Sequence, residues 1–343
     1  MWRRSKAINL ALQGGGAHGA FTWGVLDRLL EHEGITIKSV SATSSGAMNA
    51  VMLAYGLADG GPEGARALLA QFWARVASQV PFAAPNRNAI NRLEGPALEP
   101  TPWFQGYLEF ARVFSPYVAN PAGHNPLREI VGDLIDFYRL RGRCPVKLFI
   151  AATRVRSGKI EIFRNPALSL EALMASTCIP TLHHAVEIEG EPYWDGGFSG
   201  NPAVLPLIFE CHHPDIVIVM LHPASRPDTP VTGKAISEHM TELAFNSAFL
   251  REMGILSELK VLAEKGLFPF GRIERRLRRV RFHLIEKDEL LPQLSPASRF
   301  NTREPFLQLL RDQGREHAER WLEQTYREIG IRSSFDYGAR FAQ

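Results

Sequence analysis

Ser44 is the residue whose surroundings point most directly to chemistry. It stands in Ala42-Thr43-Ser44-Ser45-Gly46, between an apolar strand pattern and a helical pattern. Small neighbours let a chain turn sharply from strand to helix and expose one hydroxyl at the helix N-terminus, which is the geometry of a nucleophile elbow. The usual elbow reads G-x-S-x-G, and alanine replaces the first glycine here. A serine that only caps the helix is the structural alternative.

A glycine-rich loop, Gly14-Gly15-Gly16-Ala17-His18-Gly19, follows an earlier apolar segment. Its G-x-G-x-x-G spacing also fits a dinucleotide site, which requires an acidic residue at the end of the second strand. That strand instead ends in serine and threonine, so we expect no nucleotide cofactor. The other interpretation is an oxyanion hole, in which backbone N–H groups of Gly14, Gly15 and Gly16, joined by Ser45, stabilise a developing negative charge.

Asp195 precedes Gly196-Gly197 and is the third candidate. The glycines let other groups approach the carboxylate closely, although an aspartate before glycines is also a common turn residue. A serine hydroxyl is a weak nucleophile until a base takes its proton. We therefore expect Ser44 and Asp195 to lie within hydrogen-bond reach and to act together as a catalytic dyad.

The elements that would position these residues alternate between strand and helix, which predicts the α/β class. Apolar periodicity predicts strands at 7–12, 35–40, 146–155, 159–163, 185–188, 193–194, 215–221 and 282–285. It predicts helices at 45–57, 65–77, 126–140, 170–176, 236–262 and 303–329. In an open parallel sheet the glycine loop and the serine turn would meet at the carboxyl edge, where such folds place their sites.

Composition excludes several other classes of protein. The chain has 343 residues and a net charge of +3, so nothing in its charge calls for nucleic acid. Its three cysteines lack metal-type spacing, and His183-His184 and His212-His213 lack it too, so no metal is expected. No apolar run reaches the length of a membrane span or of a signal-peptide core. A reduced, cytoplasmic chain is the expectation.

Two stretches could adapt the protein to lipid. Residues 80–125 are rich in proline and aromatic residues, which is typical of a cap over a site, or alternatively of a surface excursion. Arg272, Arg275, Arg276 and Arg279 share one face of a predicted helix. Such a basic face either contacts an anionic membrane peripherally or is simply solvated.

Taken in order, the glycine loop, the Ser44 turn and Asp195-Gly196-Gly197 resemble the motifs of the patatin-like phospholipases. Ala175-Ser176-Thr177-Cys178-Ile179-Pro180 is similar to that family's A-S-x-x-x-P block, and the resemblance covers about residues 7–222. It implies a serine lipid acyl hydrolase with Ser44 as nucleophile, Asp195 as base and the glycine loop as oxyanion hole. This chain departs from the family at His18, where arginine or lysine is usual, and at Ala42.

The resemblance also implies an architecture and a partner. We expect a three-layer sandwich around a mostly parallel central sheet, with residues 1–230 as the catalytic core and 80–125 as a cap-like insertion. Residues 231–343 would form a mainly helical C-terminal extension packed on that core. The expected partner is an acyl lipid. A transacylase with the same dyad and a catalytically silent lipid-binding protein are the alternatives, and the sequence leaves the head group, acyl chain and oligomeric state open.

Overall fold

The computed structural model describes residues 5–79, 106, 114–222, 229–265, 271–286, 294 and 296–341 of the chain. Of the predicted cap at 80–125, only residue 106 and the part from residue 114 onward fall within this set. The remainder of the cap, together with the apolar stretch 267–270 before the arginine-rich helix, lies outside the described residues.

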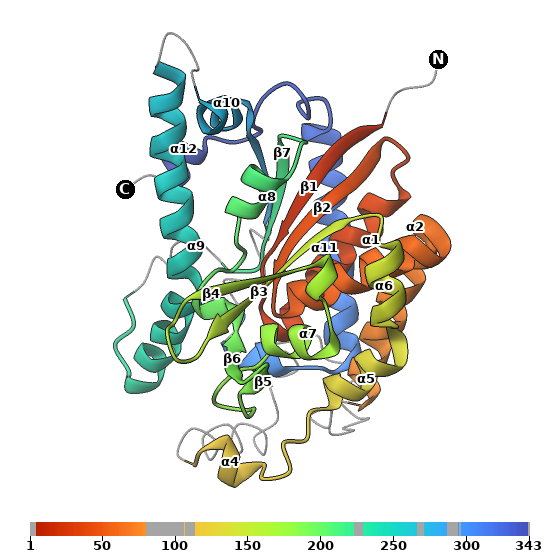
Figure 1. Cartoon of the computed structure of the whole chain (residues 1–343), viewed down its shortest axis with the longest axis vertical. Coiled ribbons are helices and arrows are strands. Elements are labelled where there is room, and N and C mark those ends of the chain that lie inside the picture. The colour runs from red at the N-terminus through yellow and green to blue at the C-terminus, as the bar shows by residue number, and fades with distance from the viewer. Residues whose placement is uncertain are drawn as a thin grey trace.

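A single mixed sheet organises the described part of the chain (Figure 1). Its strands are β1 (Lys6–Leu12), β2 (Ile35–Thr43), β3 (Lys147–Arg154), β4 (Ile160–Arg164), β5 (Val186–Ile188), β6 (Glu191–Asp195), β7 (Asp215–Met220) and β8 (Arg281–Glu286). They follow the order β5-β6-β3-β2-β1-β7-β8, with β4 paired to β3 off this path. β3, β2, β1, β7 and β8 are parallel, whereas β4, β5 and β6 pair antiparallel.

Helices fill the connections between the strands. They are α1 (Gly19–Glu31), α2 (Ser45–Gln79), α4 (Pro116–Ala119), α5 (Pro126–Leu134), α6 (Phe137–Arg143), α7 (Leu170–Ser176), α8 (Leu205–Glu210), α9 (Gly233–Lys265), α10 (Arg272–Arg279), α11 (Glu304–Thr325) and α12 (Tyr337–Phe341). Short 3-10 turns are η1 (Gly16–His18), η4 (Asn165–Ala167), η5 (Gly196–Phe198) and η7 (Pro296–Phe300). α2 is two helices merged across a kink at Gly60 and Gly61, as the separate patterns at 45–57 and 65–77 predict.

The single helix predicted over 126–140 is wrong. Ile135 is extended and ends α5, and the Asp136 carboxylate accepts hydrogen bonds from the N–H groups of Tyr138 and Arg139. An aspartate in that position is a strong N-cap, so it begins a second helix where apolar spacing alone suggests one continuous helix.

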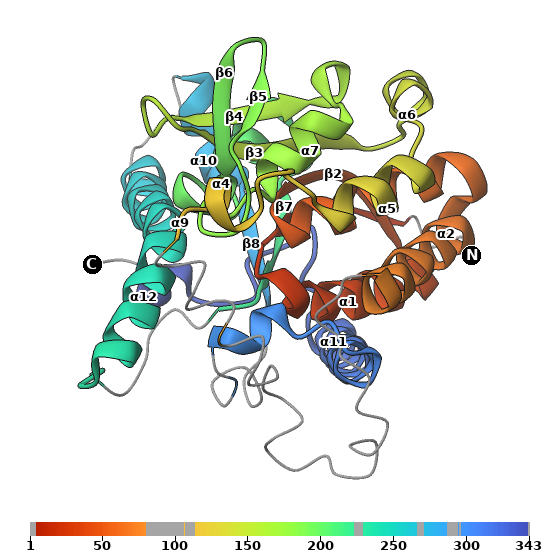
Figure 2. The ribbon, with the colours of Figure 1, turned by 90° about the horizontal axis from the view of Figure 1, so that it is seen from below.

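Each face of the sheet carries its own apolar cluster. Ile8, Leu10 and Leu12 of β1 belong to the cluster that includes α1, α2 and α11. Ala11 faces the opposite way and packs in the cluster of α8, α9, α10 and α12. Figures 1 and 2 show α9 and α12 on one side of the sheet and α1, α2 and α11 on the other. This confirms the three-layer α/β sandwich with a mostly parallel central sheet.

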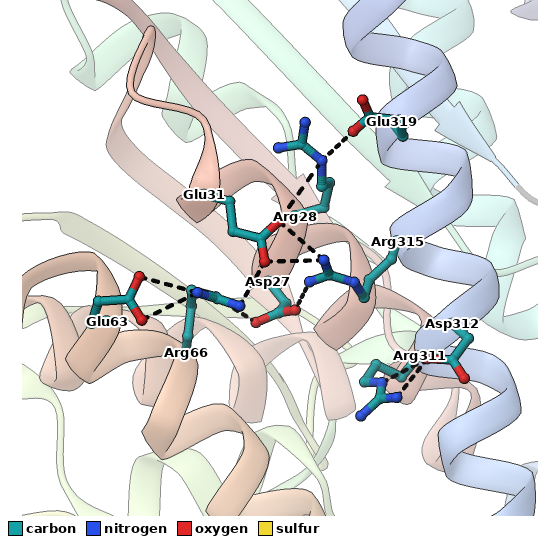
Figure 3. A network of polar contacts seen from close by, with 9 residues as sticks. All are labelled: Asp27, Arg28, Glu31, Glu63, Arg66, Arg311, Asp312, Arg315 and Glu319. Carbon is teal, nitrogen blue, oxygen red and sulfur yellow. Dashed lines mark hydrogen bonds and ion pairs between the residues drawn. The ribbon is translucent and has the colours of Figure 1, made fainter.

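The C-terminal part is tied into the same body. β8 pairs in parallel with β7, so the segment 231–343 adds one strand to the sheet. α11 packs so closely on α1 that a Cβ at Gly24 would lie 1.9 Å from the Arg311 carbonyl oxygen. Charged side chains join the same two helices in Figure 3, where Arg315 pairs with Asp27 and Glu31.

Candidate active site

The predicted elbow forms at Ser44. β2 ends at Thr43, α2 begins at Ser45, and Ser44 between them has a φ of 55°, a left-handed conformation that costs a residue with a Cβ roughly 1–3 kcal/mol. Gly46 is needed here, because a Cβ would lie 2.5 Å from the Leu12 carbonyl oxygen. Ala42 lies within β2 and pairs with Leu12 and Ile150, so alanine satisfies a position that only needs a small side chain in a buried strand.

Asp195 ends β6, where it pairs with Ala152 of β3. The strand must come close to its neighbours, since a Cβ at Gly196 would lie 2.3 Å from the Ala151 carbonyl oxygen and 3.0 Å from Thr43 Cγ2. Thr43 pairs with Ala151 from the other side of β3. Ala151 and Ala152 are neighbours in β3, so the strand pairings on its two sides bring Asp195 close to Ser44. The two residues are 151 positions apart in the chain.

The Asp195 carboxyl group is fully buried and only partly satisfied. Oδ1 accepts a hydrogen bond from Gly197 N–H at 2.7 Å, whereas Oδ2 has no hydrogen-bond partner among the described residues. Burial raises the pKa of Asp195 to about 7, against the lowering effects of the Gly197 N–H and the Ser44 hydroxyl. The Ser44 hydroxyl therefore lies near the Asp195 carboxyl group, and catalytic hydrogen bonds often tighten only when substrate binds.

The block Ala175–Pro180 holds both members of this pair through its backbone and one hydroxyl. Ser176 Oγ accepts a hydrogen bond from Ser44 N–H at 3.0 Å. The Cys178 carbonyl oxygen accepts one from Asp195 N–H at 2.8 Å. The physical role of this motif is to fix the two turns relative to each other.

The four predicted oxyanion residues divide into two pairs. Gly14 N–H donates to Asn201 Oδ1 at 2.6 Å, and Gly15 N–H donates to Ser45 Oγ at 3.0 Å, so both are engaged within the protein. Gly16, with a φ of 60°, and Ser45 both line the pocket beside Ser44. Ser45 N–H also lies in the first turn of α2, where a helix offers no acceptor of its own.

A pocket of about 390 Å³ opens beside Ser44. Its wall is largely apolar and includes Met48, Phe72, Trp73, Val76, Leu127, Ile179, Leu182 and Phe300. Ala119 of α4 and Asn120 just after it belong to the lining, so the described end of the predicted cap does reach the pocket. His183 also lines it, and burial lowers its pKa to about 4, which keeps it neutral near pH 7.

His18 lies behind the glycine loop and is not among the residues that line the pocket. It is buried, and its Nε2 lies 2.8 Å from Ser298 Oγ. Arg299, which comes from η7, does line the pocket. Neither Arg299 nor Asn201 belongs to a recognisable local motif, which is why the sequence analysis missed both.

Other kinds of site find no support in the described residues. No group of three or more His, Cys, Asp or Glu side chains there is arranged to hold a metal ion. The end of β2 carries Thr43 and Ser44 where a dinucleotide site needs a carboxylate. Within the same residues, every helix is too short or too polar to cross a bilayer.

The fold and this site define an α/β protein with a serine at a strand-to-helix elbow and a glycine loop beside it. The family model for patatin-like phospholipase matches residues 10–208, more than half of the chain. The chain therefore belongs to the patatin-like phospholipase family, a family of lipid acyl hydrolases, and the resemblance seen in the motifs is confirmed.

Two bacterial proteins are among the solved structures that the chain matches. VipD from Legionella pneumophila is 16% identical, with 91% of this chain and 67% of that chain covered and a TM-score of 0.38. ExoU in its heterodimeric complex with SpcU, from the type III secretion system of Pseudomonas aeruginosa, is 18% identical, with 93% of this chain and 52% of that chain covered and a TM-score of 0.35. No curated protein sequence matches the chain.

Proposed function

We propose that this protein is a serine lipid acyl hydrolase that cleaves carboxylic ester bonds of phospholipids or other acyl lipids through a Ser44–Asp195 dyad. One observation carries the proposal. A strained, left-handed serine lies beside a fully buried carboxyl group whose pKa is raised to about 7. A base that titrates near the working pH can both take and return a proton, which is what general acid–base catalysis requires.

The reaction follows from these groups. Asp195 Oδ2 takes the proton of the Ser44 hydroxyl while Ser44 Oγ attacks the ester carbonyl carbon. The tetrahedral oxyanion is stabilised by backbone N–H groups at Gly16 and Ser45, and each such donor is worth roughly 3–4 kcal/mol. When the intermediate collapses, the protonated Asp195 gives its proton to the leaving alcohol and the acyl group stays on Ser44. Water, deprotonated by Asp195, then attacks the acyl carbonyl carbon, and when this second intermediate collapses the bond to Ser44 Oγ breaks, Asp195 returns the proton to Ser44 Oγ and the fatty acid leaves.

The pocket suits an acyl substrate. Its apolar wall can bury a hydrocarbon chain beside Ser44, and burial of each CH₂ group contributes roughly 0.8 kcal/mol. Transfer of the acyl group to an acceptor alcohol in place of water would make the protein a transacylase with the same dyad. A catalytically silent protein would use the pocket for binding alone.

Covalent labelling and product analysis test the proposal together. The wild-type chain should react with a fluorophosphonate probe at Ser44 and hydrolyse p-nitrophenyl esters or phospholipid vesicles, whereas Ser44→Ala should do neither. Ser78→Ala is the matched control, because Ser78 is exposed near the far end of the same helix and bonds only locally to the Arg75 carbonyl oxygen. Wild-type protein without labelling or turnover would overturn the proposal, and acyl transfer to an added alcohol would redirect it to a transacylase.

A further inference from the structure

A charged cluster from the C-terminal part of the chain lies behind the glycine loop. Arg299 of η7 donates from its guanidinium to Glu242 Oε1 of α9 at 2.8 Å and lies 3.4 Å from Nδ1 of His222, just after β7. The side chains of Arg299 and Glu242 are only 14% and 11% exposed, so this is a nearly buried ion pair. Arg299 also lines the pocket that holds Ser44.

The hydrogen bonds fix the form of His222. Its Nε2 lies 3.1 Å from the Gly14 carbonyl oxygen, which can only accept, so Nε2 must carry the proton. In the neutral ring Nδ1 is then an acceptor, which matches the donor that Arg299 presents to it. The charged pair and the imidazole therefore form one directed chain that runs from Glu242 through Arg299 and His222 to the glycine loop.

The chain ends on the peptide group that sets the direction of the loop. The Gly14 carbonyl oxygen receives His222 Nε2 at 3.1 Å and Asn201 Nδ2 at 3.3 Å. A trans peptide is rigid and planar, so fixing this C=O also fixes Gly15 N–H, which donates to Ser45 Oγ and thereby joins the loop to the residue proposed as an oxyanion donor. The next residue is held as well, because a Cβ on Gly16 would lie 2.4 Å from the Arg299 carbonyl oxygen.

We propose that Arg299 is a positioning residue that acts through His222 to hold the glycine loop in the orientation needed for oxyanion stabilisation. Arg299, His222 and Glu242 all lie beyond the residues 10–208 that match the family model. The catalytic unit of this chain thus includes its C-terminal part. This inference rests on the proposed hydrolase function and adds a residue to it.

A purely structural ion pair would have different consequences. It would change stability and leave the rate per folded molecule unaltered. A positioning role acts on the transition state, because the loop donors matter most when the oxyanion has formed. It should therefore lower kcat while KM, which reflects binding in the apolar pocket, stays nearly constant.

The test compares four variants with wild type in ester hydrolysis, with folding verified by thermal melting. Arg299→Met should lower kcat by about 10- to 100-fold, part of the 10²–10³ that loss of one oxyanion donor typically costs. Arg299→Lys keeps a cation that can reach Glu242 and should recover part of the rate. His222→Leu should act like Arg299→Met, whereas His222→Gln keeps an N–H donor for the Gly14 carbonyl oxygen and should retain more activity.

Arg315→Met is the matched control. Arg315 also joins the C-terminal part to the core, through Asp27 and Glu31, but at the outer face of α1, away from the pocket. It should lose stability without a change in kcat per folded molecule. The inference is overturned if Arg299→Met hydrolyses the ester at the wild-type rate. If Arg299→Met does not fold, a wild-type rate for His222→Leu overturns it instead. Inactive wild-type protein would instead defeat the proposed function, so the two failures are distinguishable.

Discussion

Two buried aspartates at opposite ends of the sheet show how one side chain can serve two purposes. Asp215 begins β7, and its carboxylate accepts hydrogen bonds from Arg281, His283 and Gly330. These partners hold the pKa of Asp215 well below its usual range, despite its burial. Asp195 at the pocket end has one backbone donor, and its pKa rises to about 7.

The contrast separates a structural carboxylate from a reactive one. A carboxylate whose two oxygens both accept hydrogen bonds, one of them from several donors, has little tendency to take a proton, so Asp215 can hold strands together and is a poor base. A carboxylate left with an unoccupied buried oxygen is costly to the fold but ready to accept a proton. Both carboxylates are buried, so the feature that distinguishes the candidate active site is the smaller number of hydrogen bonds that Asp195 accepts.

The largest expected effect is on turnover. Ser44→Ala should abolish ester hydrolysis and covalent labelling, and Asp195→Asn should lower kcat by about 10³- to 10⁴-fold or more, because an amide cannot accept the serine proton. Asp215→Asn should leave kcat per folded molecule near wild type. The double variant of Ser44 and Asp195 should be little worse than either single one, since the two act as a unit. A p-nitrophenyl ester assay of the purified variants measures these values. Equal losses of kcat in Asp195→Asn and Asp215→Asn would contradict the distinction between the two aspartates.

For stability, the two aspartates should rank in the opposite order, with the larger loss expected from the change at Asp215. Asp215→Asn removes a charge from a paired and largely buried group, leaving Arg281 and His283 with a weaker acceptor, and should lower the free energy of unfolding by about 2–4 kcal/mol. Asp195→Asn should not destabilise the protein at pH 8. Urea titrations at one pH measure both values, and an Asp195→Asn protein less stable than Asp215→Asn would contradict the distinction.

The raised pKa of Asp195 predicts a pH profile of defined sign. Activity requires the deprotonated carboxylate, so kcat/KM should rise with pH through about 7. Stability should change the other way. Between pH 3.8, the ordinary pKa of an aspartate, and about pH 7, Asp195 stays protonated in the folded protein but has lost its proton in the unfolded chain. This contribution is full below pH 3.8 and is lost as pH rises to 7, amounting to roughly 4 kcal/mol at about 1.4 kcal/mol per pKa unit.

Asp195→Asn should remove that pH dependence, which makes the variant its own control. Relative to wild type, its free energy of unfolding should gain with rising pH and level off above 7. A wild-type rate profile that is flat between pH 6 and 8 would show that a different group, or none, titrates in the catalytic step.

The smallest expected effect is at the amino end of the sheet, where α10 precedes β8. Of the predicted basic face, Arg276 is turned inward and donates to the carbonyl oxygens of Ile208 and Phe209, so three arginines, Arg272, Arg275 and Arg279, remain exposed. Each contributes on the order of 1 kcal/mol near an anionic surface. Replacing Arg272, Arg275 and Arg279 by glutamine should therefore reduce co-sedimentation with anionic vesicles, most visibly at low salt. Unchanged co-sedimentation would contradict a role of this face in membrane binding.

The same variant sharpens the comparison between the two ends. Because α10 lies at the end opposite Ser44, binding through it would direct the pocket away from the bilayer. Hydrolysis of a soluble ester should be unaffected by the triple replacement. A loss of soluble esterase activity would mean that the two ends are coupled.

Local patterns were enough to predict the turns from which the candidate site is built. A backbone geometry that few other sequences can adopt is indicated by the residues around Ser44, by the three glycines and by Asp195-Gly196-Gly197. The alternation of apolar segments predicts the parallel sheet. The cluster of Glu242, Arg299 and His222 could not be predicted, because each residue is ordinary in its own segment and becomes informative only when the fold brings three distant segments together. The break at Asp136 was missed because a capping side chain overrode apolar spacing.

The contribution of η7 and α11 to the glycine loop also has a consequence during synthesis. A chain emerging from the ribosome exposes Ser44 and Asp195 before Arg299 has been translated, and at 5–20 residues per second the delay is roughly ten seconds. Until the C-terminal segments arrive, the backbone of α1 at Gly24 lacks its cover and the loop lacks its support. The nascent polypeptide would thus present Ser44 and Asp195 before the segments that complete their surroundings have been made.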